Sequence, residues 1–347
     1  MERRSEAVVA VQFDPEDGRK AFVRALGQAG AAKVTVIDVF GQDTPVSGKE
    51  STQDLMVKFG VKSSNYSISS ITPSDVFSTF IRVSNYLKGK STATVNSTTG
   101  SLGNITMGDY VNLKSLTVAA YNGNGGNFDR TNTDLAGENE SLRLMVVGIN
   151  PYSGKNDNGT STPHLIFHFR GHMEQARMES TSTNENGYLG SEMRKYLTPV
   201  DGVPGSGNYW TALKASGVPE SVVWKVSRRV ANKGNADGTH TIEDYLWLPT
   251  EREMFGPSGS SYSPPFWSNT TYETNTNQGY FAYYNSDAKR IKSSDNRITV
   301  GYWLASPQYY YVSIRDTDFC CANAIDGVNS GAFAIGRSSV VPAFAVK

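Results

Sequence analysis

The apolar residues of this chain occur in short runs separated by segments rich in glycine, asparagine, serine and threonine. Residues 142–149 and 164–173 read as strands, and the polar stretch 150–163 separates them. The stretch Asn122–Asn127 contains only asparagine and glycine, which indicates a loop. This pattern predicts an α+β fold with short strands, a few short helices and long loops, rather than a helical bundle.

Beyond residue 70, helices are predicted at three places. Thr72–Asp75 is a good start for a helix over residues 76–87, and residues 191–197 form a second, short helix. Thr250 and Glu253 have the spacing of a capping box, which begins another helical turn.

Further strands are predicted over residues 113–121, 222–230 and 245–248. Residues 1–70 read as a small separate module. No motif identifies its function, and attachment or oligomerisation is the role left by elimination. In it, residues 8–13 and 33–40 have strand character and residues 19–29 have helical spacing.

Charge and composition exclude several classes of function. The 33 basic and 33 acidic side chains cancel, which argues against a nucleic-acid binder and against charge-driven attachment to lipid. No apolar run approaches the length of about 18 residues that a membrane-spanning helix needs, so no membrane insertion is expected. The apolar run near the start of the chain, Ala7–Val11, is too short and too soon interrupted for a signal peptide, and none is visible.

The candidate catalytic and metal-ligating residues are better explained by structure. His164, His168 and His172 would share one side of a strand but lie about 13 Å apart in succession, so one metal cannot reach all three. We interpret them as the polar side of a half-buried strand. Glu251 and Glu253 lie at a predicted helix start, where acidic residues are favoured, and no metal or cofactor is expected.

The only cysteines, Cys320 and Cys321, are adjacent, which disfavours a disulfide between them. No histidine or cationic neighbour lies close in sequence to activate either thiol, so packing is the interpretation for Cys320.

The C-terminal segment has an unusual composition. Three tyrosines, Tyr309–Tyr311, precede a mixture of serine, arginine and aspartate that has neither helical nor strand periodicity. Rigid aromatic residues beside small polar ones are typical of binding loops. Residues 309–346 contain no Lys, Glu, Gln, Met or Trp, although these types supply 50 of the first 308 residues. About six would be expected from composition. Randomising the adenines of AAC or AAT codons produces none of the five types.

Eight blocks in order then resemble variable proteins of diversity-generating retroelements, which have a C-type lectin-like fold. The blocks are Val146–Asn150, Thr162–Phe167, Ser182–Tyr188, Ser191–Leu197, Gly217–Val222, Leu246–Glu251, Tyr302–Pro307 and Val341–Phe344. The resemblance implies a ligand-binding region over 71–347 with a lectin-like core over about 145–347. It also implies a variable segment over about 308–340, rewritten by adenine-specific mutagenesis.

The same resemblance implies which positions are fixed and which face a ligand. Scaffold positions would be Trp303, Leu304, Phe319, Pro342 and Phe344. Ligand-facing positions would be Tyr309, Tyr310, Tyr311, Ser313, Arg315, Asp316, Asp318, Asn323, Asp326, Asn329, Ser330, Phe333 and Arg337. The three tyrosines and Arg315 are the strongest candidates because tyrosine and arginine supply most interface hot spots.

Family members of this kind are phage-tail host-attachment proteins or are displayed on cell surfaces. The expected partner is a protein or glycan receptor on a target cell, and a homo-oligomer is compatible with this role. The calcium-binding sugar motifs of true C-type lectins are missing, so calcium-dependent sugar recognition is not expected.

Two alternatives stay open. Leu248–Glu251 also resembles the LPTE stretch of formylglycine-generating enzymes, which share the lectin-like fold, but those enzymes use two cysteines several residues apart. An adhesin with a fixed ligand is the other alternative. A repeat differing only at adenines, close to the gene, would distinguish diversification from that adhesin.

Overall fold

The structure, a computed structural model, is a mixed α+β protein in which nearly all strand pairs are antiparallel. It describes the backbone of residues 34–37 and 43–46 and, beyond them, residues 73–88, 90, 101–102, 105–125, 128–131, 142–155, 162–171, 174–231, 239–256, 279–290, 301–308, 318–323 and 327–347.

One five-stranded sheet has the order β11-β18-β9-β8-β5. Its strands are β5 (Tyr110–Asn112), β8 (Arg143–Ile149), β9 (Leu165–Phe169), β11 (Val223–Trp224) and β18 (Ala343–Val346). The central strand β9 pairs with β18 on one side, where Phe167 is opposite Phe344, and with β8 on the other. All five residues of β9 are buried, because the strand is covered on both faces as well as paired on both sides.

The second five-stranded sheet has the order β10-β17-β14-β15-β16. Its strands are β10 (Gln175–Ala176), β14 (Tyr302–Pro307), β15 (Asp318–Ala322), β16 (Asn329–Phe333) and β17 (Ser338–Ser339). β14 pairs antiparallel with β15 and parallel with β17, and β15 and β16 form a hairpin. This sheet therefore collects the part of the chain in which the sequence predicts the variable segment.

Four two-stranded ladders complete the strands that the structure describes. They are β1 (Val34–Ile37) with β2 (Asp43–Val46), β3 (Ser101–Leu102) with β4 (Ile105–Thr106), β6 (Ser115–Val118) with β7 (Phe128–Thr131), and β12 (Val226–Ala231) with β13 (Thr239–Asp244).

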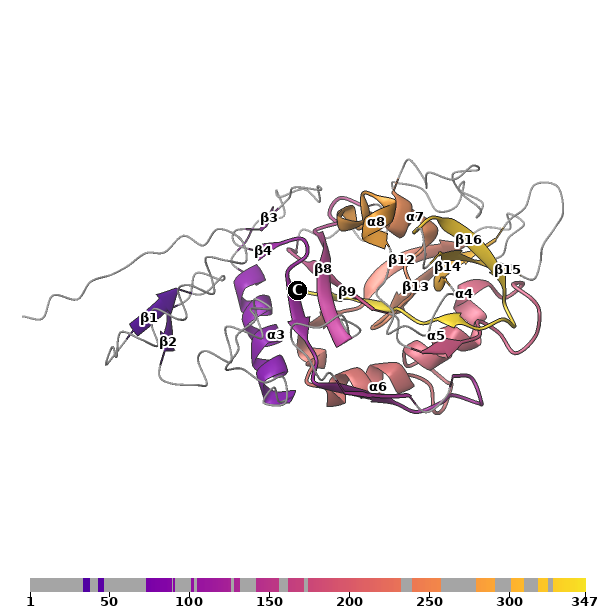
Figure 1. The fold of residues 1–347 in the computed structure, drawn as a ribbon, viewed down its shortest axis with the longest axis horizontal. Coiled ribbons are helices and arrows are strands. Elements are labelled where there is room, and N and C mark those ends of the chain that lie inside the picture. The colour runs from indigo at the N-terminus through magenta and orange to yellow at the C-terminus, as the bar shows by residue number, and fades with distance from the viewer. Residues whose placement is uncertain are drawn as a thin grey trace, which may run out of the picture.

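The helices are mostly short. They are α3 (Pro73–Lys88), α4 (Gly187–Gly190), α5 (Glu192–Leu197), α6 (Asn208–Ala215), α7 (Glu251–Phe255) and α8 (Asp287–Arg290), with 3-10 turns η3 (Glu220–Val222) and η4 (Ala282–Tyr284). Figure 1 places α3 on the opposite side of the molecule from β15 and β16.

One cluster of buried apolar residues extends from Val76 in α3 to Val346 in β18. The ring of Phe80 packs edge-on against Phe167 at 5.2 Å between centroids, and Phe167 stacks on Phe344 at 5.5 Å. The hydroxyl of Ser84 donates to the carbonyl oxygen of Lys347 over 2.6 Å. Helix α3 therefore shares its core with the C-terminal strand, which ends beside it in Figure 1.

Several elements agree with the sequence. The predicted helix over 76–87 is α3, which begins at Pro73, and the helix over 191–197 is α5 with Ser191 as its N-cap. β8 lies within the predicted strand 142–149, β6 within 113–121, and β1 within 33–40. Residues 8–13 and 19–29 lie outside the described residues.

Three strand predictions need correction. Residues 245–248 are not a strand: β13 ends at Asp244, and in this stretch Trp247 makes only an isolated bridge to Ala343. The predicted strand 222–230 is divided into β11 and β12, which belong to different sheets. The strand that contains His168 is fully buried rather than half-buried, because neighbours cover both its faces.

Candidate functional site

The strands β14 and β15 form a fully buried frame for the predicted variable segment. Every residue of both strands is buried. The indole nitrogen of Trp303 donates to the carbonyl oxygen of Ala176 over 2.7 Å, which ties the frame to β10. All five predicted scaffold residues are confirmed as buried: Trp303, Leu304, Phe319, Pro342 and Phe344.

Hydrogen bonds hold Gln308 and Asp318 together, the two described residues on either side of positions 309–317. The backbone N–H of Gln308 donates to the carbonyl oxygen of Asp318 over 2.9 Å. The side-chain amide nitrogen of Asn184, a residue only 1% exposed, donates to the same carbonyl oxygen over 2.9 Å. It also donates to the carbonyl oxygen of Gln308 over 3.4 Å. Asn184 therefore fixes the position of Gln308, which follows β14, relative to Asp318, which begins β15.

Seven of the predicted ligand-facing residues lie outside the described residues. They are Tyr309, Tyr310, Tyr311, Ser313, Arg315, Asp316 and Asp326.

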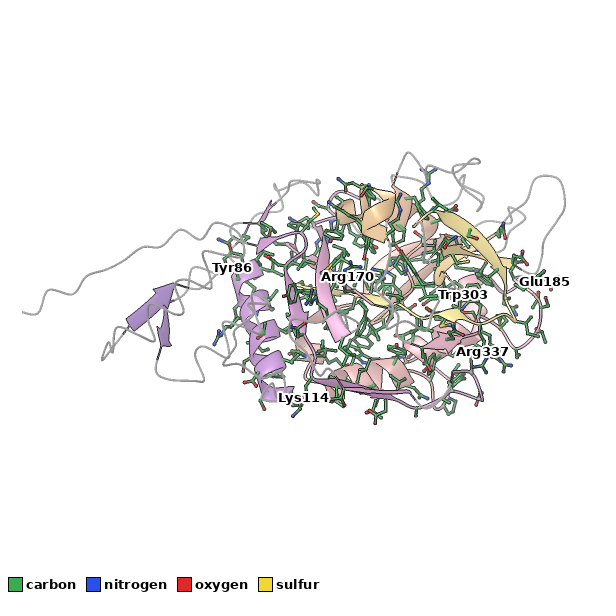
Figure 2. The ribbon with its side chains drawn as sticks, viewed as in Figure 1. Tyr86, Lys114, Arg170, Glu185, Trp303 and Arg337 are labelled. Carbon is green, nitrogen blue, oxygen red and sulfur yellow. The ribbon has the colours of Figure 1, made fainter. Side chains whose placement is uncertain are left out.

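The hairpin β15–β16 and the turn after it carry most of the predicted positions that are described. Asn323 follows β15 and is partly exposed, Asn329 begins β16, and Ser330 in β16 is partly exposed. Phe333, at the end of β16, is 56% exposed, and Arg337 is exposed in the connection to β17. Trp303 is fully buried and Arg337 is exposed, although Figure 2 labels both in the same part of the molecule.

The prediction that Asp318 faces a ligand needs correction. It is only 3% exposed, so it does not present its side chain to solvent as a ligand-facing residue would. The reason is its position: it opens the buried strand β15, pairs with Phe333 and supplies the carbonyl that Gln308 and Asn184 bind.

Ile335 is an exposed residue that the sequence reasoning missed. It is 50% exposed and lies between Phe333 and Arg337, while Ala334 beside it is fully buried. The signal available in the sequence was that the large side chains of Phe333, Ile335 and Arg337 alternate with the small residues Ala334 and Gly336. We call Phe333, Ile335 and Arg337 the exposed patch.

The exposed patch is attached to the body of the protein through Ala334. Its carbonyl oxygen accepts hydrogen bonds from the backbone N–H groups of Met178, over 2.9 Å, and Glu179, over 3.1 Å. Burial raises the pKa of the Glu179 carboxyl to about 7, and the nearby carboxylate of Glu192 adds to the rise. The backbone N–H of Glu192 and the charge of Lys195 act in the opposite direction.

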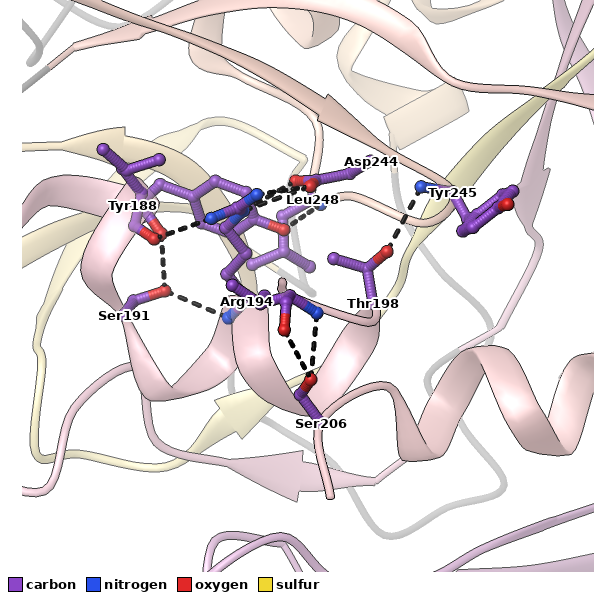
Figure 3. A network of polar contacts seen from close by, with 10 residues as sticks. Tyr188, Ser191, Arg194, Thr198, Ser206, Asp244, Tyr245 and Leu248 are labelled. Carbon is purple, nitrogen blue, oxygen red and sulfur yellow. Dashed lines mark hydrogen bonds and ion pairs between the residues drawn. The ribbon is translucent and has the colours of Figure 1, made fainter. Parts of the chain in front are cut away.

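A polar network supports the short helices beside this sheet, where α4 packs against β14 (Figure 3). The guanidinium of Arg194 donates to both carboxylate oxygens of Asp244, at distances from 2.8 to 3.1 Å. The hydroxyl of Tyr188 accepts from the backbone N–H of Leu248 over 3.2 Å, and the Ser191 side chain accepts from the N–H of Arg194 over 3.0 Å. These contacts fix α5 against β13 and α4 against Leu248, in the segment that follows β13.

The histidines are held as structural groups. His164 and His168 are fully buried, and His172 lies outside the described residues. One ring nitrogen of His168 lies 2.5 Å from the hydroxyl of Tyr284, and the other lies 2.8 Å from the carbonyl oxygen of Val341. Burial lowers the pKa of His164 to about 4, which keeps its imidazole neutral at pH 7. In the described ranges, no three His, Cys, Asp or Glu side chains come together as a metal site would require.

The two glutamates are also structural. Glu253 completes a capping box with Thr250, as the sequence predicts, and both Glu251 and Glu253 are fully buried. Arg228 donates to the two carboxylate oxygens of Glu253 over 2.8 and 2.7 Å, and the hydroxyl of Tyr152 donates to the same carboxylate. The carboxylate of Glu253 is therefore occupied by internal partners.

The adjacent cysteines are free and buried. Burial, followed by the charge of Asp318, raises the pKa of the Cys321 thiol to about 12. A thiol with so high a pKa carries almost no thiolate at pH 7, and thiolate is the nucleophilic form.

None of the helices in the described part of the chain has the length and apolar character that crossing a lipid bilayer requires. Neither a curated protein nor a solved structure matches the sequence. Residues 164–347, more than half of the chain, match the family described as "Domain of unknown function (DUF6273)". This chain belongs to the DUF6273 family.

Proposed function

We propose that this chain is a target-binding protein, a variable protein of a diversity-generating retroelement whose C-terminal region has a C-type lectin-like fold. Its surface around residues 308–340 recognises a protein or glycan receptor on a target cell. The protein acts in host attachment, on a phage tail or on a cell surface, and it is not an enzyme.

One observation carries this proposal: burial separates two groups of residues within a single stretch of the chain. Between residues 301 and 347, the predicted scaffold positions are fully buried, whereas Phe333, Ile335 and Arg337 are exposed. Exposed side chains away from special features change stability by only about 0.5 kcal/mol when substituted. A surface of this kind tolerates exchange of its side chains while the frame stays folded.

The hydrogen bonds at Asn184 support the same reading. Residues 309–317, which include Tyr309–Tyr311, connect two positions that backbone and amide contacts fix. Binding residues are commonly found on connections held by a rigid scaffold. The short antiparallel strands, short helices and long connections are compatible with the lectin-like fold.

The formylglycine-generating enzyme is the weaker alternative. Its chemistry needs reactive thiols, and the two cysteines here are adjacent and buried, with the pKa of Cys321 raised. Thr250, within the Leu248–Glu251 stretch, is the N-cap of α7, which gives this stretch a structural explanation.

Sequencing the DNA around the gene tests diversification. We expect a near-identical repeat of the region encoding residues 308–340 that differs only at adenines, together with a reverse transcriptase gene. Finding neither would refute diversification and leave the adhesin with a fixed ligand.

A binding experiment tests the surface. In pull-downs from target-cell envelopes, replacing Tyr309, Tyr310 and Tyr311 together with alanine should abolish capture of the receptor and shift the melting temperature by only a few degrees. A large loss of thermal stability would assign these rings to the core instead.

A further inference from the structure

The strand β16 is the last strand at one edge of its sheet, as far as the structure describes it. Among the strands that the structure describes, it pairs with β15 alone, in an unbroken register from Asp318 opposite Phe333 to Ala322 opposite Asn329. The other three edges of the two five-stranded sheets are β5, β10 and β11, with only two or three residues each. β16 has five residues and is the long edge.

The backbone groups of β16 alternate in direction. The N–H of Asn323 donates to the carbonyl oxygen of Val328, so this pair is hydrogen-bonded. Because hydrogen-bonded and non-bonded pairs alternate along an antiparallel ladder, Ser330 and Ala332 bond to β15. The backbone groups of Asn329 and Gly331 and the N–H of Phe333 then point away from β15.

A second contact supports this assignment. The carbonyl oxygen of Asp318 accepts from the backbone N–H of Gln308, the residue after β14, so it does not point toward Phe333, its partner across the hairpin. The carbonyl oxygen of Phe333 accepts from the N–H of Gly336 over 2.7 Å. This leaves the N–H groups of three residues and the carbonyls of two, at alternate positions, directed outward from the edge.

The sequence and register of β16 lack three of the features by which proteins block pairing at a sheet edge, namely charge, proline and a bulge. Its sequence, Asn-Ser-Gly-Ala-Phe, has no charged residue and no proline, and its register with β15 contains no bulge. Such features, or very short edge strands, normally prevent another chain from adding to a sheet. Phe333 and Ile335, both about half exposed, lie at the end of this edge.

We propose that the target is a protein and that an extended segment of it adds to the sheet as a strand beside β16. This inference rests on the proposed binding function and specifies the class of partner. The backbone of Asn329, Gly331 and Phe333 supplies the hydrogen bonds, and the side chains of Phe333 and Ile335 provide apolar contact. In this mode main-chain bonds give affinity and side-chain contacts give specificity. A glycan has no backbone of alternating N–H and C=O groups at the spacing of a β-strand, which this edge would pair with.

A matched pair of proline variants tests strand addition. Proline is tolerated on an edge strand where its missing N–H faces outward. Asn329→Pro removes an outward N–H and should leave the melting temperature within a few degrees of wild type. Ser330→Pro, one residue on, removes an inward N–H that bonds to β15 and should lower it clearly.

The probe is a phage-displayed library of linear peptides selected on the immobilised full-length protein. Peptides selected on wild type should bind Asn329→Pro about tenfold more weakly or worse, and Phe333→Ala severalfold more weakly. Equal binding to wild type and Asn329→Pro would overturn strand addition while leaving the binding function intact. A second outcome would also overturn strand addition and leave the binding function intact. In that outcome no peptide is selected, and the protein binds a glycan array in a way that Arg337→Ala abolishes.

Hydrogen exchange gives a second readout should Asn329→Pro be less stable than expected. When a selected peptide binds wild type, exchange should slow at the amides of residues 329, 331 and 333 and stay unchanged at 330 and 332. Protection confined to 330 and 332, or absent from all five amides, would contradict the proposal.

Discussion

The two strands of the β15–β16 hairpin have the same length but different surroundings. All five residues of β15 are buried between β14 and β16, whereas β16 is bordered on one side only and ends at Phe333, which is 56% exposed. Phe319 in β15 is fully buried. Neighbouring strands can therefore hold a residue that the fold requires and a residue that it does not.

The largest expected effect is in the frame. Trp303→Ala removes a fully buried indole and its hydrogen bond to Ala176. We expect a loss of about 3–5 kcal/mol in the free energy of unfolding, measured by denaturant titration. An unchanged midpoint would mean that β14 is not the rigid frame described here.

A smaller effect is expected where the frame meets the segment 309–317. Asn184→Ala leaves the buried carbonyl oxygens of Gln308 and Asp318 with fewer donors, which should cost about 1–3 kcal/mol. Glu185, which is exposed nearby, provides the matched control: Glu185→Ala should leave the unfolding midpoint close to that of wild type. Equal losses in the two variants would remove Asn184 from its proposed role.

The stability of the protein should depend on pH through Glu179, which lies behind the exposed patch. The Glu179 carboxyl has its pKa raised from its ordinary value of 4.5 to about 7, so the folded protein binds its proton more tightly than the unfolded chain does. This contribution to stability is full below about pH 4.5 and is lost as the pH rises to about 7.

Glu179→Gln should therefore flatten the dependence of stability on pH over this range. At pH 8 it should stabilise the protein by about 1 kcal/mol, a magnitude reduced by solvent screening. Unfolding curves for both proteins between pH 4.5 and 8 measure this difference. A parallel pH dependence in both would exclude Glu179 as its source.

The smallest effects are expected in the exposed patch itself. Phe333→Ala and Arg337→Ala should each change the free energy of unfolding by no more than about 0.5 kcal/mol, because both side chains are exposed. Receptor capture, measured beside unfolding, should fall for both. A loss of stability comparable to that of Trp303→Ala would erase the difference between the two strands.

Local signals in the sequence were sufficient for the elements that local rules govern. The Thr72–Asp75 start located α3, and the spacing of Thr250 and Glu253 identified the capping box. The apolar run 142–149 located β8. In each case the signal lies within a few residues of the structure that it predicts.

The elements that tertiary contacts govern could not be predicted in this way. β15 and β16 contain aspartate, asparagine, glycine and alanine, which are depleted in strands, and they form through pairing with each other and, for β15, with β14. Residues 245–248 looked like a strand because they are apolar, but Leu246, Trp247 and Leu248 are buried by packing. Asp318 contacts Gln308 and Asn184 through its carbonyl oxygen. Asn184 is far from it in the sequence, and no local pattern marks either contact.

The most direct test of the central claim compares a triple variant in the exposed surface with a single variant in the frame. In the full-length protein, Ser330→Ala, Phe333→Ala and Arg337→Ala together should change the free energy of unfolding by about 1 kcal/mol or less, while Phe319→Ala alone should lose about 3–5 kcal/mol. If the triple variant loses as much stability as Phe319→Ala, the exposed residues are part of the fold, and the separation of frame from binding surface is wrong.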